Sequence, residues 1–189
     1  PLGDYIATTL ESDRDTKVES WTYRIIGVDP GKEQNWSAYA RSVLAFSLMG
    51  VLLLYLLQRI QQWLPFSLGD GPVAPQVAFN TAISFVTNTN WQAYSPETTL
   101  GYTVQFAGLV VQNFVSAATG IAVAVALVRG LARRHCATIG NFWVDLVRIT
   151  GRVLLPGAAI GAIVLMAGGV VQNLEGFRTV TTLARHVQT

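Results

Sequence analysis

A short apolar stretch that turns polar before it could cross a membrane constrains the fold of this chain most. Residues 79–94, FNTAISFVTNTNWQAY, begin without a charge or a glycine and pass into a run of threonine and asparagine. A helix that spans a bilayer needs about 20 apolar residues, so this segment can enter a bilayer without crossing it. Lipid offers a polar backbone no hydrogen-bond partner, so the run that follows must face water or an ion. The pattern favours a re-entrant hairpin, with a half-length helix at about 75–86 and a polar strand at 87–92.

A second interpretation of this stretch is an exposed loop after a short buried helix, with threonine and asparagine as ordinary turn residues. The flanking sequence argues against it, because three long segments carry no charge: Ser42–Gln58, Thr98–Val128 and Val153–Leu174. The last two are long enough to cross a hydrocarbon layer of about 30 Å. We therefore expect an integral membrane chain, although 189 residues with 51% apolar and 13% charged content could also form a soluble domain.

Charge and cysteine content disfavour several classes of function. The net charge is +2, and no block of lysine and arginine suits a phosphate backbone, so nucleic acid is not an expected partner. One cysteine, Cys136, excludes an internal disulfide and a paired-cysteine metal site. His135 and His186 have no second ligand at metal-binding spacing, so we expect both to be solvated or interfacial.

The first 37 residues form a polar segment with one amphipathic part. Its apolar residues fall on one helical face: Val18, Trp21, Ile25 and Ile26. Trp21 and Tyr23 suit the headgroup boundary of a bilayer. The pattern predicts a short interfacial helix that ends at Gly27 and the Asp29-Pro30-Gly31 turn. A solvated linker with a small amphipathic turn is the alternative.

Two spanning helices should flank the hairpin. The first runs from about Trp36 to Trp63, with its span at about 38–62, and has aromatic residues at both ends. Its central segment, LAFSLMGVLLLYLL, is apolar on all sides. The second, at about 98–129, should open at Ser95-Pro96-Glu97. Its charge-free run of about 31 residues would extend about 46 Å, so it must tilt, bend or project. One of its faces carries a polar stripe, which either contacts other helices or lines water: Gln105, Gln112, Ser116, Thr119 and Gly120.

A third span should follow at about 142–171. Its lead-in, 141–152, contains Asp145 and Arg148, which are three residues apart and could pair. Pro156 can kink the span, and Gly157 and Gly161 permit close helix contact. The order is span, half-length helix, polar strand and span, followed by the first span of a further unit.

Basic residues indicate the orientation. Arginines gather in and after the turn that closes the second span: Arg129, Arg133, Arg134, Arg148 and Arg152. Cytoplasmic loops carry an excess of lysine and arginine, so we expect this turn and the segment 1–37 to be cytoplasmic. The hairpin then opens from the outer face, and 172–189 is a polar exit on that side.

Three blocks of sequence carry a resemblance to a known family: SFVTNTNWQAY, LVVQNFVSAATGIAVAVALVRG and GNFWVDLVRIT. With them the chain resembles the potassium-binding A subunits of the Kdp potassium-transporting ATPase, in the superfamily of potassium transporters. The resemblance implies an all-α membrane protein in which units of helix, pore helix and helix surround one selectivity filter. It implies an N-terminal fragment, with the first full unit at 38–130 and the first helix of a second unit within 131–189.

The resemblance also implies a site. The filter residues would be Thr87, Asn88, Thr89 and Asn90, which bind potassium through backbone and threonine oxygens. Later filter segments of the family have glycine where this chain has Thr89. We expect the two asparagines to brace the strand through side-chain hydrogen bonds, Trp91 to pack behind it, and Gln92 to support selectivity near the outer mouth.

The implied function is potassium binding and translocation in an ATP-driven uptake complex of the bacterial plasma membrane. The implied partners are a P-type ATPase B subunit, which hydrolyses ATP, and smaller C and F subunits. This chain has no nucleotide-binding motif, so we expect no catalytic residues and no organic cofactor in it. A stand-alone potassium channel or symporter subunit is the alternative. A membrane scaffold or intramembrane enzyme is disfavoured, because the charge-free runs supply no ionisable groups.

Overall fold

The computed structural model describes residues 1–12, 14–132, 137–171, 180–181 and 187–188. Their regular structure is helical apart from two short strands, β1 (Val180–Thr181) and β2 (Val187–Gln188), which pair antiparallel. Several expectations lie outside these residues: those for Arg133, Arg134, His135, Cys136 and His186, and most of the exit at 172–189.

Within the described ranges, three helices are long and apolar enough to cross a membrane: Trp36–Trp63, Val104–Ala132 and Phe142–Ala167. The first consists of α3 (Trp36–Ile60) and a 3₁₀ turn, η1 (Gln61–Trp63). The second joins a π-helical segment, η3 (Val104–Val110), to α5 (Val111–Ala132). The third joins α6 (Phe142–Arg148), a π-helical segment η4 (Ile149–Leu154), and α7 (Leu155–Ala167). The predicted all-α membrane protein is confirmed.

The remaining helices are short. They are α1 (Leu2–Leu10), α2 (Lys17–Ile26), α4 (Pro75–Val86) and a 3₁₀ turn, η2 (Pro96–Thr98). Helix α2 starts with a capping box between Thr16 and Glu19 and ends at Gly27, whose φ of 69° is the left-handed conformation that glycine adopts readily. The helix before Gly27 is confirmed, but Tyr23 is only 2% exposed and does not face a headgroup boundary.

The chain forms two compact units. The first contains residues 1–47 and 114–167. Its core gathers around alanines spaced four apart on α5, Ala118, Ala122 and Ala126, which share one helical face. The larger side chains buried in this core are Leu10, Tyr39, Phe142, Leu146 and Ile149. Rings of Tyr39 and Phe142 meet edge to face with centroids 5.6 Å apart. The packing joins parts of α1, α3, α5 and α6 into one cluster.

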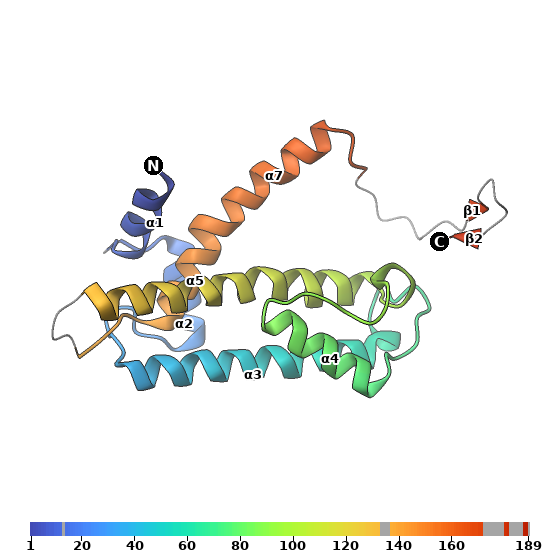
Figure 1. The fold of residues 1–189 in the computed structure, drawn as a ribbon, viewed down its shortest axis with the longest axis horizontal. Helices are drawn as coiled ribbons and strands as arrows, with labels where there is room; N and C mark the ends of the chain where they lie inside the picture. The colour runs from blue at the N-terminus through green and yellow to red at the C-terminus, as the bar shows by residue number, and fades with distance from the viewer. Residues whose placement is uncertain (13, 133–136, 172–179, 182–186, 189) are drawn as a thin grey trace. The chain divides into compact units, whose positions relative to one another are not determined.

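The second unit contains residues 48–113 and the described residues after 167. Its core holds α4 between the end of the first span and the start of the second: Leu54, Val73, Ala78, Ala82, Phe85, Leu100, Val104 and Leu109. This core positions the half-length helix that the sequence singles out (Figure 1).

The second span begins later than the sequence predicts. After η2 the chain is not helical again until Tyr102, so the helix does not open at Ser95-Pro96-Glu97. The reason is that the backbone here bonds to the segment after α3. The Gln61 amide donates to the Thr99 carbonyl at 2.9 Å, and the Tyr102 N–H donates to the Phe66 carbonyl at 2.9 Å.

Candidate functional site

The half-length helix α4 spans Pro75–Val86, the range expected from the sequence. Proline at its first position fits, because the ring fixes a helical φ and that N–H has no helical acceptor. Its buried face comprises Ala78, Thr81, Ala82, Ser84 and Phe85. The following residues, 87–90, are exposed in this chain, so the helix presents them at its C-terminal end.

Ser84 organises the polar strand. Its carbonyl oxygen accepts the N–H groups of Thr89 at 2.9 Å and Asn90 at 3.2 Å, and its hydroxyl accepts the N–H of Trp91 at 2.9 Å. Earlier N–H groups also point back at the helix, since Thr87 donates to the Ile83 carbonyl at 2.9 Å. The N–H groups of this strand are therefore held against the end of α4.

The carbonyl groups of the strand must point the other way. In a planar trans peptide, the C=O of one residue is antiparallel to the N–H of the next. Because the N–H groups that follow them are bonded to Ser84, the carbonyls of Asn88, Thr89 and Asn90 point away from the helix end. The negative end of the α4 dipole lies behind them. The arrangement presents neutral oxygens in a region of negative potential, which suits a cation.

The asparagines make this backbone path possible. Asn88 has φ of 59° and Asn90 has φ of 60°, a left-handed conformation that asparagine tolerates better than most residues. Thr89 is not among the positive-φ residues, so the glycine that later filter segments carry is not required there. The Asn90 amide also donates to Asn88 Oδ1 at 3.3 Å. This bond links the two asparagine side chains across Thr89, and their bracing role stays a prediction.

The side chains of this strand add hydroxyl oxygens to the carbonyl groups, and one side chain, that of Trp91, lies differently from the prediction. The hydroxyl oxygens of Thr87 and Thr89 lie 3.2 Å apart. Gln92 is half-buried, and its Oε1 atom is enclosed without a hydrogen-bond partner among the described residues. Trp91 is 65% exposed, so within this chain it does not pack behind the strand as expected. Its ring therefore has no packing role that these residues reveal.

Gln58 ties the hairpin to the first span and was missed by sequence reasoning. Its fully buried amide donates to the Ala78 carbonyl of α4 at 3.1 Å. Its Oε1 accepts from the Tyr94 hydroxyl at 2.8 Å. Burial raises the pKa of Tyr94, so this hydroxyl stays protonated and donates. The available signal was an amide directly at the end of an apolar run, where it can reach a neighbouring backbone.

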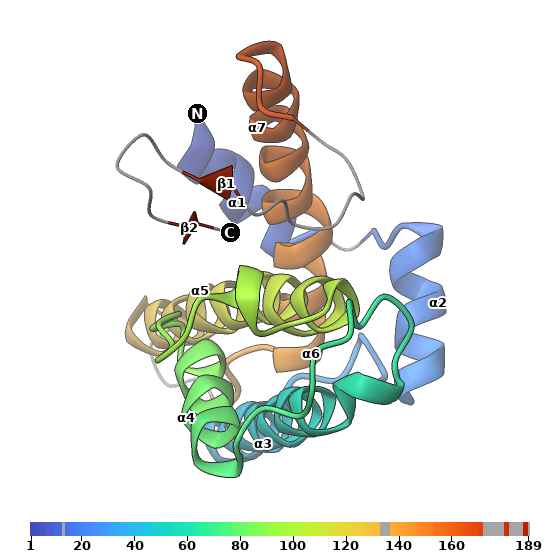
Figure 2. The same ribbon diagram turned by 90° about the vertical axis from the view of Figure 1, so that its right-hand side faces the viewer.

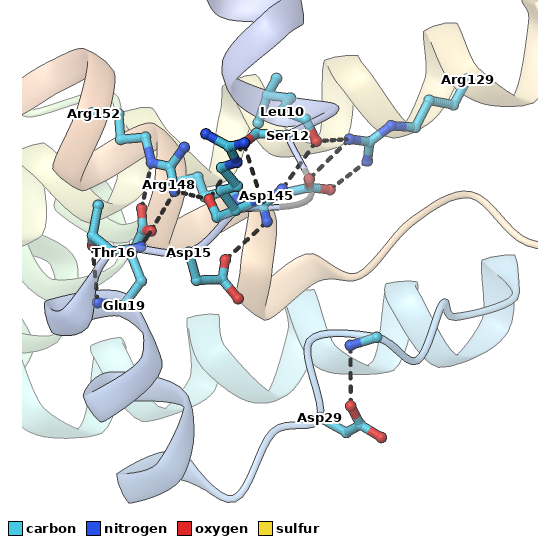
Figure 3. A network of polar contacts seen from close by, with 12 residues as sticks. Leu10, Ser12, Asp15, Thr16, Glu19, Asp29, Arg129, Asp145, Arg148 and Arg152 are labelled. Atoms are coloured by element: carbon cyan, nitrogen blue, oxygen red, sulfur yellow. Dashed lines mark hydrogen bonds and ion pairs between the residues drawn. The ribbon is translucent and has the colours of Figure 1, made fainter.

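A second polar cluster lies in the other unit (Figure 3). Arg129 binds Asp145 with both guanidinium nitrogens, at 2.7 and 3.1 Å. The Tyr39 hydroxyl lies 3.0 Å from Asp145 Oδ2. Arg148 instead binds Asp15 at 2.9 Å, so the predicted pairing of Asp145 with Arg148 is wrong. Asp145 pairs with Arg129, although Arg148 is nearer in sequence, because the last turn of α5 brings Arg129 beside the first turn of α6. There the planar guanidinium group of Arg129 matches the carboxylate.

This second cluster is structural in character. Its charged groups are paired and bonded to backbone, and it joins α3, α5 and α6 through a buried bidentate pair. Among the described residues, no group of three histidine, cysteine or acidic side chains could hold a metal ion. The neutral oxygens after α4 are the better candidate for ion binding.

The chain is similar to known proteins of one family. The family model for the potassium-transporting ATPase A subunit matches residues 1–189. The chain is 64% identical over 183 residues to the potassium-transporting ATPase potassium-binding subunit of Cutibacterium acnes, covering 97% of this chain and 33% of that protein. It is 62% identical over 189 residues to the protein of the same name from Clavibacter sepedonicus, covering 100% and 34%.

A protein of that name from Streptomyces coelicolor is 59% identical over 180 residues, which is 95% of this chain and 32% of the relative. The chain thus spans about a third of the length of the curated relatives it matches. With a match over its whole sequence, the chain belongs to the potassium-transporting ATPase A subunit family.

Proposed function

We propose that this chain is part of the potassium-binding and translocating subunit of an ATP-driven potassium uptake complex. Family membership and the names of the relatives support this proposal. The carrying observation is the strand after α4, whose N–H groups are held by Ser84 while its carbonyls point outward. The strand at Thr87, Asn88, Thr89 and Asn90 supplies one wall of the selectivity filter.

Neutral oxygens explain a preference for potassium over tighter-binding cations. Backbone carbonyls and threonine hydroxyls can replace the water shell of a large, weakly hydrated ion. No acidic residue lies between Asp70 and Glu97. A carboxylate there would hold the ion more strongly and slow its release, so the charge-free loop suits transport.

Gln92 and Trp91 support selectivity from the edge of the strand. The Oε1 atom of Gln92 has no hydrogen-bond partner among the described residues, so it is an acceptor still to be satisfied in the full-length protein. The exposed Trp91 ring offers an apolar face that another part of the full-length protein can cover. Both contacts would fix the outer end of the filter wall.

Transport by this subunit requires partners. ATP hydrolysis lies in a P-type ATPase B subunit, with C and F subunits completing the complex. The relatives are bacterial, and the chain would lie in the plasma membrane with several spans. The hairpin opens from the outer face, and residues 1–37 lie on the cytoplasmic side. Potassium is the transported ion, and no organic cofactor is needed here.

The experiment replaces Asn90 in the full-length protein by glycine and by valine. If the backbone carbonyls bind potassium, glycine keeps the left-handed φ and leaves potassium affinity within about threefold, whereas valine, which resists that φ, weakens it at least about tenfold. Ala93→Val is the control for added bulk in the same loop. Affinity is measured for potassium, rubidium and sodium with the assembled complex.

The opposite pattern rejects the proposal. If glycine abolishes binding as fully as valine does, the asparagine side chain rather than the backbone is the ligand. If all three variants retain the affinity and selectivity of the parent, the strand is not the filter.

A further inference from the structure

We propose that α2 lies partly inserted in the lipid–water interface and contacts anionic headgroups. The helix has two faces of opposite character. Glu19 and Tyr23 are buried, at 4% and 2% exposed, and face the protein. Val18, Trp21 and Ile25, at positions three and four apart, are 71%, 63% and 62% exposed. A continuous apolar stripe therefore faces outward from the unit.

The protein face of α2 sets its depth relative to the membrane. Glu19 forms an ion pair with Arg152, with Arg152 Nε 2.6 Å from Glu19 Oε1. Arg152 is the last charged residue before the uncharged run that begins at Val153 in the third span. A charge at that position marks the edge of the hydrocarbon layer. Since the bond from Arg152 to Glu19 ties α2 to this position, α2 lies at the same boundary. Figure 2 shows the course of α2.

The outward stripe has the chemistry of an interfacial helix. Trp21 at its centre combines a large apolar ring with an N–H donor, which suits the headgroup region. Lys17 and Arg24, seven residues apart, lie on one flank of the stripe, and both are exposed. The only acid of the helix, Glu19, is paired with Arg152. The charge that α2 presents outward is therefore basic, which matches anionic lipid rather than a neutral surface.

The test places nitroxide labels on cysteines introduced into the full-length protein in vesicles. Sites Val18→Cys and Ile25→Cys sample the stripe, and Ser20→Cys samples an exposed position off the stripe. We expect the two stripe labels to collide mainly with oxygen, which concentrates in lipid, and the Ser20 label mainly with a water-soluble nickel chelate. Chelate access at all three sites overturns the proposal. Protection of the stripe labels from both reagents also overturns it, because protein then covers the stripe.

A second arm tests the headgroup charge. The difference in oxygen and chelate accessibility between the stripe labels and the Ser20 label is compared in phosphatidylcholine vesicles and in vesicles that also contain phosphatidylglycerol. Lys17→Gln with Arg24→Gln should lower the equilibrium constant for insertion of α2 about fivefold for each charge in the anionic vesicles, and little in the neutral ones. Lys32→Gln, an exposed lysine outside the helix, is the matched control. If the double variant keeps the same difference in label accessibility in anionic vesicles, the assignment to anionic headgroups is overturned.

Discussion

Tyr5 bonds to a carbonyl oxygen of the third span where the helix changes its bonding pattern and Pro156 offers no N–H. The π-helical segment η4 ends at Leu154, the Leu155 N–H still donates to the Thr150 carbonyl, and α7 follows. Proline at position 156 has no N–H to donate. The Arg152 carbonyl accepts a hydrogen bond from the Tyr5 hydroxyl at 2.8 Å. One side chain of α1 thereby supplies a donor at an irregular turn of a helix far along the chain.

Removing this hydroxyl tests the compensation. Tyr5→Phe should lower the free energy of unfolding by about 0.5–1.5 kcal/mol, towards the lower end because Tyr5 is half exposed. The same change in a Pro156→Ala background should cost less, since alanine adds a backbone N–H donor close to this carbonyl. A double-mutant cycle from unfolding of the full-length protein in detergent measures the difference. Equal costs in both backgrounds would contradict the role assigned to Tyr5.

At the scale of single residues, local patterns could be predicted and long-range pairings could not. The run Thr87 to Asn90 stands out in the sequence because it interrupts an apolar stretch. The role of Ser84 depends on the path that the strand takes after the helix, which composition does not reveal. The partner of Asp145 was mistaken because helical spacing favours a near neighbour, while folding brings Arg129 to it from another helix.

At the scale of elements, periodicity and helix caps predicted most of the helices. Helix α2 has a 3.6-residue apolar pattern and a terminal glycine, and α4 starts at a proline. The π-helical segments η3 and η4 were not foreseen, because they change the backbone bonding without a distinct residue pattern. The late start of the second span follows from hydrogen bonds to a loop distant in sequence.

Close packing at Gly101 fixes the point at which the second span becomes helical, at Tyr102. A Cβ atom here would lie 2.5 Å from Ser67 Cα and 2.7 Å from the Phe66 carbonyl oxygen, which are backbone atoms that cannot rotate away. Gly101→Ala should therefore destabilise the full-length protein by about 1–3 kcal/mol, through forced backbone shifts. Gly71→Ala is the control, because its Cβ would meet nothing within 4 Å. Equal melting temperatures for the two variants would show that the loop yields.

At the scale of the molecule, the pairing of Glu19 with Arg152 makes the attachment of the N-terminal segment depend on pH. Burial raises the pKa of Glu19, but hydrogen bonds from Arg152 and Thr16 outweigh it, and the net pKa lies below the ordinary value of 4.5. A lowered pKa in the folded state stabilises the fold above pH 4.5, and this contribution is lost as the pH falls through the folded pKa.

Glu19→Gln measures that contribution. The parent should be more stable than the variant at neutral pH, and the gap in melting temperature should shrink as the pH falls below 4.5. Glu11→Gln, at an exposed position, is the control for loss of a carboxylate. A gap that stays constant down to acid pH would mean that the charge of Glu19 does not hold the segment.

Hydropathy alone predicted the membrane class and the three spans, because each span contains a long charge-free run. It did not predict how residues 1–35 attach to the third span. That attachment uses ion pairs such as Arg148 with Asp15, whose members are separated by most of the chain. Such pairs leave no periodic trace in a sequence.

Ser84 accepts hydrogen bonds from three backbone N–H groups, and this local arrangement helps the loop to fold while the protein is being synthesised. A loop that must enter a membrane early, while later parts of the protein are still being translated, risks exposing bare amides to lipid. Here the residues needed to satisfy those amides lie within a few positions of one another. This loop can therefore take its shape as soon as the ribosome has released it, before the rest of the protein has been made.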